Sequence, residues 1–118
     1  MMENEFIPHK EALALKELGF DVECFGCYTK DKELSLDYST NKGEPHYFQD
    51  CAAPIYQQAF RWFREKYEII HMIYKVKNDY VFGFEEIGGF HNNSTYEEAE
   101  LACLRKLIKI VNQNKEDG

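Results

Sequence analysis

The sequence predicts an α+β fold with the element order helix–hairpin–helix–hairpin–helix. Three segments carry apolar residues at helical spacing, and the two segments between them alternate apolar and polar residues around a turn. Each hairpin would have one apolar face, which favours a four-stranded antiparallel sheet with the helices packed on one face. At 118 residues the chain is expected to fold as a single domain, 1–118.

The first helix is expected from Pro8 to Leu18. Proline is favoured in the first turn of a helix, and Gly19 can take the left-handed conformation that ends one. Phe20 follows this glycine, at a position whose side chain commonly packs back onto the last turn, here onto Leu15. Local signals therefore predict both ends of this helix.

Two further helices are expected over residues 54–67 and 95–112. The later one begins with Thr95 and Glu98, the spacing of a capping box, in which each side chain bonds the backbone N–H of the other residue. The earlier one has an apolar stripe that should face the sheet. This stripe consists of Tyr56, Ala59, Phe60, Phe63 and Tyr67.

The first hairpin is expected over residues 24–38, with a two-residue turn at residues 31–32. This register pairs Thr29 with Leu34 and turns Cys24 away from the core, because residues an odd number apart on a strand point to opposite faces. Residues 39–53 show no period, so a loop is expected there. The residues predicted to face the core are Phe25, Cys27, Leu34, Leu36 and Tyr38.

The second hairpin is expected over residues 69–86, with a three-residue loop at 77–79. This register pairs Val76 with Tyr80 and places His71 on the outer face, where a histidine is typically a cross-strand partner. The polar residues 88–94 are expected to form a loop. The residues predicted to face the core are Ile70, Met72, Tyr74, Val76, Tyr80, Phe82 and Phe84.

The helix–hairpin unit occurs twice, over residues 8–38 and 54–86, before a closing helix at 95–112. The likeness between the two units lies in their pattern, since Ala12–Phe20 aligns with Ala59–Tyr67. The pattern is typical of an internal duplication.

Three segments, ALALKELGF, PIYQQAFRWFREKY and TYEEAELACLRKLI, resemble recurring blocks of small uncharacterised proteins that gut bacteria and their prophages or mobile elements encode. The most distinctive shared feature is a tyrosine followed by two polar residues and an alanine, at Tyr56–Ala59 and again at Tyr96–Ala99. The resemblance implies an accessory protein rather than a housekeeping enzyme, and it implies no particular activity.

The net charge of −7 makes nucleic acid and anionic membranes unfavourable partners. Residues 1–50 hold eleven acidic and five basic side chains, so the acidic character belongs to the first half. No segment has the length of apolar sequence that a transmembrane helix needs, and the N-terminal residues show no secretory signal. We therefore expect a cytoplasmic protein without a membrane partner.

The four cysteines are expected to be structural free thiols. Cys24 and Cys27 have the spacing of a zinc knuckle, but on a strand their sulfur atoms would point to opposite faces. No second pair with this spacing is present, and His46 and Cys51 would complete a site only with irregular spacing. We therefore expect no metal and no cofactor.

The remaining histidines, His9 and His91, are interpreted as surface residues together with His46. No nucleophile motif surrounds any cysteine, so no catalytic residue is assigned. The sequence thus predicts a non-catalytic accessory or protein-interaction domain with an unidentified protein partner. Two alternatives stay open: a small metal-dependent or Cys/His enzyme that uses Cys24, Cys27, His46 and Cys51, and an acidic inhibitor that mimics nucleic acid.

The third helix also raises the question of self-association. Its apolar residues spread over about 200° of the helix circumference, wider than the ~100° stripe of a helix that packs on one side. The first two helices of the same chain or a second copy in a homodimer would cover the remainder. The candidate contacts of such a dimer are Leu101, Leu104 and Ile108.

Overall fold

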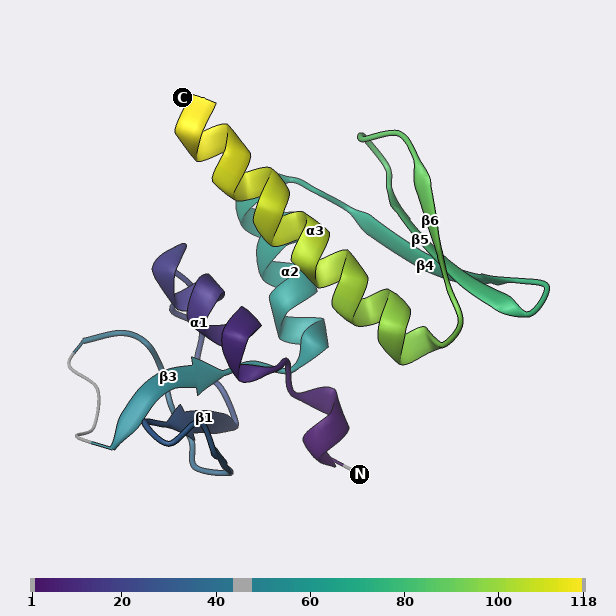
Figure 1. The fold of residues 1–118 in the computed structure, drawn as a ribbon. Coiled ribbons are helices and arrows are strands. Elements are labelled where there is room, and N and C mark those ends of the chain that lie inside the picture. The colour runs from purple at the N-terminus through teal and green to yellow at the C-terminus, as the bar shows by residue number, and fades with distance from the viewer. Residues whose placement is uncertain (1, 44–47, 118) are drawn as a thin grey trace. The chain divides into compact units, whose positions relative to one another are not determined.

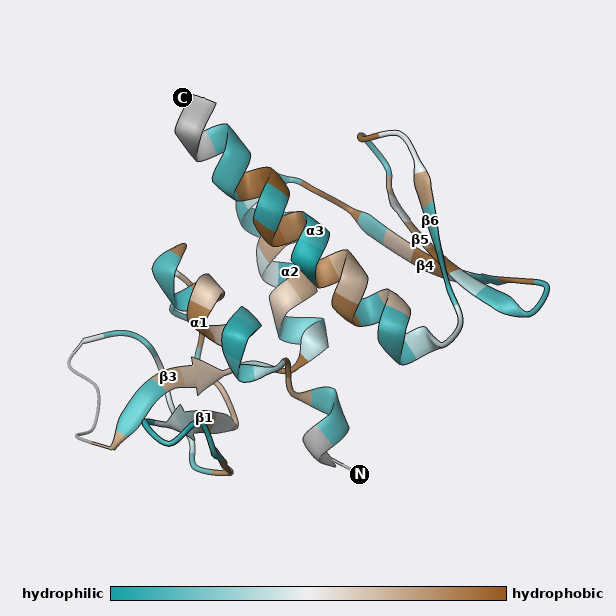
Figure 2. Ribbon diagram, in the orientation of Figure 1, coloured by the Kyte–Doolittle hydropathy of each residue, from teal (hydrophilic) through white to brown (hydrophobic). Residues whose placement is uncertain are grey.

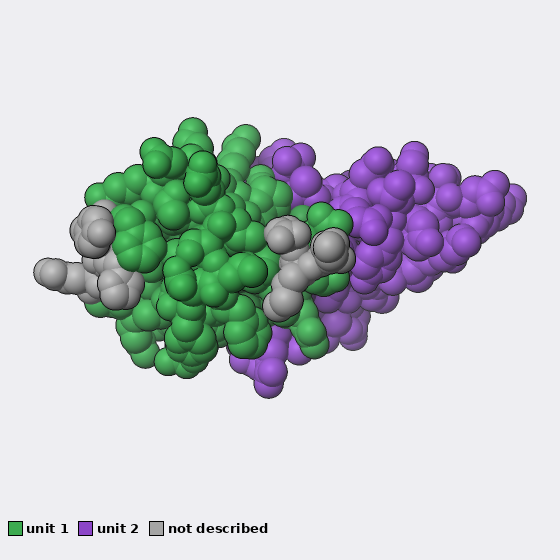
Figure 3. All heavy atoms as spheres, turned by 90° about the horizontal axis from the view of Figure 1, so that it is seen from below, with its two compact units in different colours: residues 1–59 green, residues 60–118 purple. Residues whose placement is uncertain are grey.

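The computed structural model describes residues 2–43 and 48–117, and the chain divides into two compact units, residues 1–59 and 60–118 (Figure 3). A short 3-10 helix (Met2–Glu5) and α1 are followed by strands β1 to β3, helix α2, strands β4 to β6 and helix α3 (Figure 1). The α+β class is confirmed. The predicted four-stranded sheet is wrong, because the described strands form two three-stranded antiparallel sheets, one in each unit.

Helix α1 spans His9–Glu17, within the predicted range. Two backbone hydrogen bonds close its C-terminus: the N–H of Gly19 donates to the carbonyl of Lys16 at 3.0 Å, and the N–H of Phe20 donates to the carbonyl of Leu15 at 2.9 Å. Gly19 has a φ of 97°, which an L-residue with a side chain rarely adopts. This is a Schellman motif, and it confirms the predicted helix end.

The first sheet has the strand order β2-β1-β3, formed by β1 (Gly26–Thr29), β2 (Leu34–Ser35) and β3 (Gln49–Ala53). The prediction of a loop over residues 39–53 is wrong for β3. The end of this strand, from Cys51 to Ala53, is fully buried. A strand buried on both faces lacks the alternation of polar and apolar residues by which strands are recognised.

The first hairpin differs from its predicted register by one residue. Leu34 pairs with Tyr28 rather than with Thr29. The N–H of Lys32 donates to the carbonyl of Thr29 at 2.8 Å, and Lys32 itself takes a left-handed conformation with φ 67°. A turn that ends in a left-handed residue makes a three-residue loop instead of the predicted two-residue turn. The pairing between the two strands is therefore shifted by one residue, and side chains of β2 lie on the face opposite to the predicted one.

The two cysteines of this hairpin are equally buried, and Cys24 lies outside β1, so strand alternation does not apply to it. Cys24 and Cys27 are each 1% exposed, so the prediction that only Cys27 is buried is wrong. Cys24 exchanges backbone hydrogen bonds of 2.7 and 2.9 Å with Ser39 where the hairpin ends. Three residues that were predicted to face the core are exposed instead: Phe25, Leu36 and Tyr38.

Helix α2 spans Tyr56–Tyr67, close to the predicted range. Phe63 is fully buried and Phe60 is buried, whereas Arg64 is exposed. The predicted phase of this helix is confirmed.

The second sheet is a meander with the order β4-β5-β6, formed by β4 (His71–Val76), β5 (Asp79–Phe84) and β6 (Phe90–Asn93). The prediction of a loop over residues 88–94 is wrong for β6. This strand is short and ends in two asparagines, a residue type depleted in strands.

The second hairpin also differs from its predicted register by one residue. Val76 pairs with Asp79 around a two-residue turn, where the prediction pairs Val76 with Tyr80. Lys77 has a φ of 57°, as the tight turns of two-residue hairpins require. The predicted inward face of β4 is therefore wrong, and its residues Met72, Tyr74 and Val76 are exposed.

The opposite face of this sheet packs against helices. His71, which was predicted on the outer face, is half-buried and stacks on Phe60 of α2 with 3.9 Å between ring centroids. Tyr80 contacts the ring of Tyr96 at the start of α3. Phe82 and Phe84 on this face are buried, as predicted for β5.

Helix α3 spans Tyr96–Asp117 and extends beyond its predicted end at residue 112. The N–H of Glu98 donates to Oγ1 of Thr95 at 3.1 Å, which confirms Thr95 as the N-cap of the predicted capping box. The helix contacts all three strands of the second sheet, and hydrophobic and hydrophilic residues alternate along it (Figure 2).

Both halves of the chain run from a helix into three strands, as an internal duplication would require. The strand orders differ, however. The central strand of the first sheet is β1, the first of its three strands in sequence, whereas the central strand of the second sheet is β5, the second of its three. The duplication stays a prediction.

Candidate functional site

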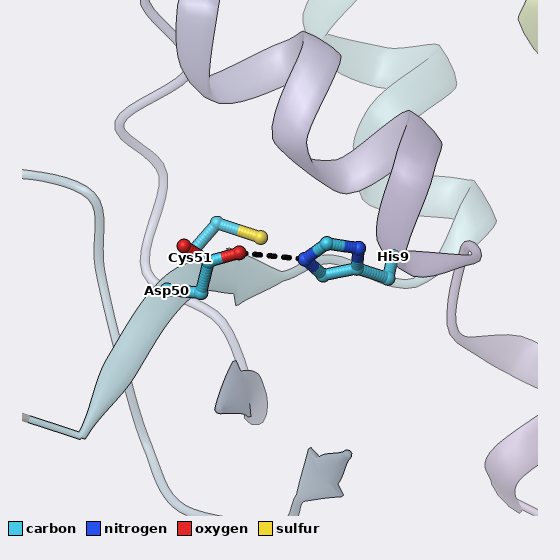
Figure 4. A group of neighbouring side chains, drawn as sticks. All are labelled: His9, Asp50 and Cys51. Atoms are coloured by element: carbon cyan, nitrogen blue, oxygen red, sulfur yellow. Dashed lines mark hydrogen bonds and ion pairs between the residues drawn. The ribbon is translucent and has the colours of Figure 1, made fainter. Parts of the chain in front are cut away.

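Three side chains that can ligate metals meet between α1 and β3, and we call them the His9 cluster: His9, Asp50 and Cys51 (Figure 4). His9 is the first residue of α1, and the other two are consecutive in β3. Nε2 of His9 lies 2.6 Å from Oδ2 of Asp50, and the ligand atoms of all three residues lie within 4.8 Å of one another. The cluster thus brings an imidazole nitrogen, a carboxylate oxygen and a thiol sulfur together.

A β-bulge explains how two consecutive strand residues reach the same place. Side chains next to each other on a regular strand point to opposite faces. Cys51 pairs with Tyr28, and the next pair is Gln49 with Thr29. Asp50 is therefore an extra residue on β3, and such a bulge redirects a side chain. Here the bulge turns the side chain of Asp50 toward α1, on the same side of β3 as the side chain of Cys51 (Figure 4).

Neighbouring residues hold the His9 cluster in position. Nζ of Lys16 donates to the backbone carbonyl of Asp50 at 2.8 Å. Tyr28 contacts the ring of His9 edge to face, with 5.4 Å between centroids, and its hydroxyl donates to the carbonyl of Ile7 at 2.7 Å. The side chain of His9 is 16% exposed and that of Asp50 is 35% exposed. Solvent therefore reaches the cluster at the carboxylate.

The thiol of Cys51 is protonated at neutral pH. Burial raises its pKa to about 12, the negative charge of Asp50 contributes in the same direction, and the charge of Lys16 opposes the shift. Burial also raises the pKa values of the Cys24 and Cys103 thiols to about 12. Because the thiolate is the nucleophilic form, none of these three thiols is activated for nucleophilic catalysis.

The structure does not bring together the described residues of the alternative metal-dependent enzyme. The residues considered were Cys24, Cys27, His46 and Cys51, of which His46 lies outside the described residues. Within residues 2–43 and 48–117, the three-ligand group takes only Cys51 from that set. The interpretation of His9 as a surface residue is wrong, since it is largely buried and paired with Asp50.

A second candidate site is the exposed side of the second sheet, which we call the outer sheet face. Directly opposed residues of antiparallel strands share a face, so the register defines its members. Its apolar residues and glycine are Met72, Tyr74, Val76, Val81, Gly83 and Phe90, and its polar members are Asp79 and Asn92. Four of the apolar members are exposed, from 37% at Met72 to 62% at Phe90, whereas Val81 and Gly83 are buried beneath them. The ring of Tyr74 contacts that of Phe90 with 6.2 Å between centroids.

Acidic residues lie at both ends of the outer sheet face. Asp79 is opposite Val76 at the turn, and the N–H of Glu85 donates to the carbonyl of Ile70 at 3.0 Å, which continues the ladder at the other end. Both acidic residues are exposed. Lys75 belongs to the opposite face, where its Nζ lies 5.9 Å from the centroid of the Tyr80 ring. The outer sheet face therefore has a largely apolar centre, in which Asn92 is polar, and an acidic residue at each end.

The residues predicted to mediate self-association lie on α3. Leu101 is half-buried, whereas Leu104 and Ile108 are buried. Self-association through α3 stays a prediction. Leu104 and Ile108 already contribute to the core, so replacing them would test stability as well as association.

Comparison of the chain with protein-family models, with curated proteins and with solved structures finds no match. Within the part of the chain that the structure describes, none of the helices combines the length and the apolar character needed to cross a bilayer.

Proposed function

We propose that this chain is a small non-catalytic protein-interaction domain whose outer sheet face binds a protein segment with apolar side chains flanked by lysine or arginine. The single observation that carries this proposal is the exposed apolar centre of that face between Asp79 and Glu85.

The composition of the outer sheet face supports a role in binding. Contiguous exposed apolar patches are uncommon on monomeric proteins and typically mark sites of association. Met72, Tyr74 and Phe90 are of residue types that are enriched in protein interfaces. The contact between the rings of Tyr74 and Phe90 restrains both side chains before a partner arrives. A restrained side chain loses less conformational entropy on binding, which favours affinity.

The charges around this face indicate the kind of partner. Lysine or arginine residues on either side of an apolar segment would lie near the carboxylates of Asp79 and Glu85, and opposite charges across an interface favour association. A second copy of the chain would instead bring its own net charge of −7 and the same acidic residues. Repulsion between like charges disfavours that homodimer.

Selection from a random peptide display library against the full-length chain tests the proposal. We expect the enriched peptides to combine large apolar residues with lysine or arginine, and to shift the NMR signals of β4 and β6. Tyr74→Asp should weaken their binding at least about tenfold, because a buried aromatic residue often dominates an interface. Leu36→Asp is the matched control at an exposed apolar residue of the first unit and should bind like the wild type.

The charge requirement is tested separately. Asp79→Asn combined with Glu85→Gln should weaken binding at low salt and have little effect at high salt, where exposed charges are screened. Peptides that bind Tyr74→Asp as well as the wild type would contradict the assignment of the site. A stable dimer in light scattering that Tyr74→Asp converts to monomer would assign the face to a second copy and overturn the proposed partner.

A further inference from the structure

We infer that His9, Asp50 and Cys51 form a binding site for one divalent transition-metal ion, with zinc as the ion whose chemistry fits best. This site lies in the first unit, and it is independent of the outer sheet face in the second.

The donor atoms favour zinc over the other common divalent ions. Zinc in proteins is bound by cysteine sulfur, histidine nitrogen and carboxylate oxygen, the three donors of the His9 cluster. Magnesium and calcium prefer sites made of oxygen atoms alone. A thiolate together with an imidazole selects a softer ion. Three protein ligands leave the fourth tetrahedral position to water or another small ligand.

The geometry requires only a small adjustment to hold an ion. Ligand atoms at ordinary zinc distances, about 2.0–2.3 Å from the metal, lie roughly 3.3–3.6 Å from one another. In the structure His9 Nε2 and Asp50 Oδ2 are closer than this, at 2.6 Å, and the widest separation in the cluster is within 4.8 Å. Shifts of about 1 Å would therefore bring all three atoms to one ion. The partly exposed side chain of Asp50 has the freedom to make such a shift.

The surroundings resemble those of a supported metal site. Residues that contact the metal ligands and hold them in orientation contribute strongly to metal affinity. Here Tyr28 packs on the imidazole of His9, and Lys16 binds the backbone of Asp50 at the bulge. The exposed edge of Asp50 provides a path by which an ion can enter. Binding would displace the proton of the Cys51 thiol to solvent, because only the thiolate ligates the ion. The resulting thiolate and the carboxylate of Asp50 would neutralise the two positive charges of the ion, which lowers the penalty for burying it.

Metal titration of the reduced, chelator-stripped full-length chain tests the inference. We expect one Co²⁺ ion per chain, with a thiolate-to-cobalt charge-transfer band and the visible bands of tetrahedral cobalt, and displacement of cobalt by Zn²⁺. His9→Gln and Asp50→Asn should each weaken cobalt binding at least about tenfold. Their matched controls are His91→Gln and Asp31→Asn, which alter an exposed histidine and an exposed aspartate elsewhere and should bind like the wild type.

The sulfur ligand is tested by Cys51→Ser, which should lose the charge-transfer band, against Cys103→Ser, which should keep it. Because both cysteines are fully buried, circular dichroism must first show that each variant is folded. If Cys51→Ser does not fold, the His9 and Asp50 variants decide. Absence of any cobalt band, or a band that persists in His9→Gln and Asp50→Asn, would overturn the inference and leave His9 and Asp50 as a structural hydrogen-bonded pair.

Discussion

The ring of Phe90 lies directly over Gly83, so that a Cβ atom added at Gly83 would approach Cδ1 of Phe90 to 2.8 Å. Real Cβ atoms do not tolerate such a distance, and the backbone carbonyl of Gly89 would be only 3.2 Å away. The glycine of β5 therefore creates the space that Phe90 occupies on the outer sheet face. Aromatic residues that cover a glycine of a neighbouring strand help to fix strand register.

Gly83→Ala should displace the ring of Phe90 and lower the free energy of unfolding by about 1–3 kcal/mol, the usual range for overpacking. Urea denaturation measures this loss. In a Phe90→Ala background the added methyl group meets less obstruction, so Gly83→Ala should destabilise less there. Gly88→Ala is the control, because no described heavy atom lies within 4 Å of its added Cβ. An equal loss in both backgrounds would contradict the contact.

Phe63→Ala should lower the free energy of unfolding by about 3–5 kcal/mol, because it removes a large, fully buried side chain from α2. Arg64→Ala, at the next and exposed position, should change it by less than about 0.5 kcal/mol. Denaturation midpoints in urea rank the two variants. A larger loss for Arg64→Ala would mean that α2 presents a different face to the core.

Cys24→Ser and Cys27→Ser should be destabilising to a similar extent, each by about 1–3 kcal/mol, because each hydroxyl would replace a thiol that is 1% exposed. The thermal midpoints of the two variants, measured under reducing conditions, provide the comparison. A loss confined to Cys27→Ser would instead support the register predicted from the sequence.

The pH dependence of stability should report on His71. Burial and the nearby charge of Arg64 lower the pKa of His71 below its usual value of 6.5. As the pH falls, His71 is therefore protonated in the unfolded chain before it is protonated in the folded chain. Its contribution to the free energy of unfolding is complete above pH 6.5 and is lost as the pH falls below that value. Urea titrations at pH 7.5 and 5.5 should show this loss in the wild type. The loss should be smaller in His71→Phe, which keeps a ring against Phe60 without the titrating group.

His91→Phe is the control for the pH experiment, because His91 is also a ring-stacked histidine of the second sheet but is exposed. It should retain the pH dependence of the wild type. If His71→Phe retains it as well, another group is responsible.

The helices could be predicted from the sequence because their signals are local. Gly19 ends α1 and Thr95 caps α3 through contacts with residues no more than five positions away. The hairpin registers could not be predicted in the same way, because they depend on Lys32 and Lys77 in left-handed conformations. Lysine is not a residue type that indicates such a conformation.

The His9 cluster could not be predicted from the sequence, for a different reason. His9 and Asp50 are 41 positions apart, and no spacing rule connects the start of a helix with a later strand. Their meeting depends on the bulge at Asp50, within a strand that itself lacks alternation. The sequence does place two residues that can ligate metals, Asp50 and Cys51, next to each other. Adjacent strand residues share a face only at a bulge, so this pair indicates a site only if a bulge is assumed there.

The two sheets should form on different timescales during folding. In the second sheet every strand pairs with its neighbour in sequence, so closure of short segments is sufficient. In the first sheet β3 pairs with β1, from which β2 and a long connection separate it in sequence. Contacts between residues distant in sequence form more slowly, because closing the loop between them costs entropy. Amide hydrogens of β4 to β6 should thus become protected from exchange before those of β3. The His9 cluster needs β3 in place and should therefore form after the second sheet.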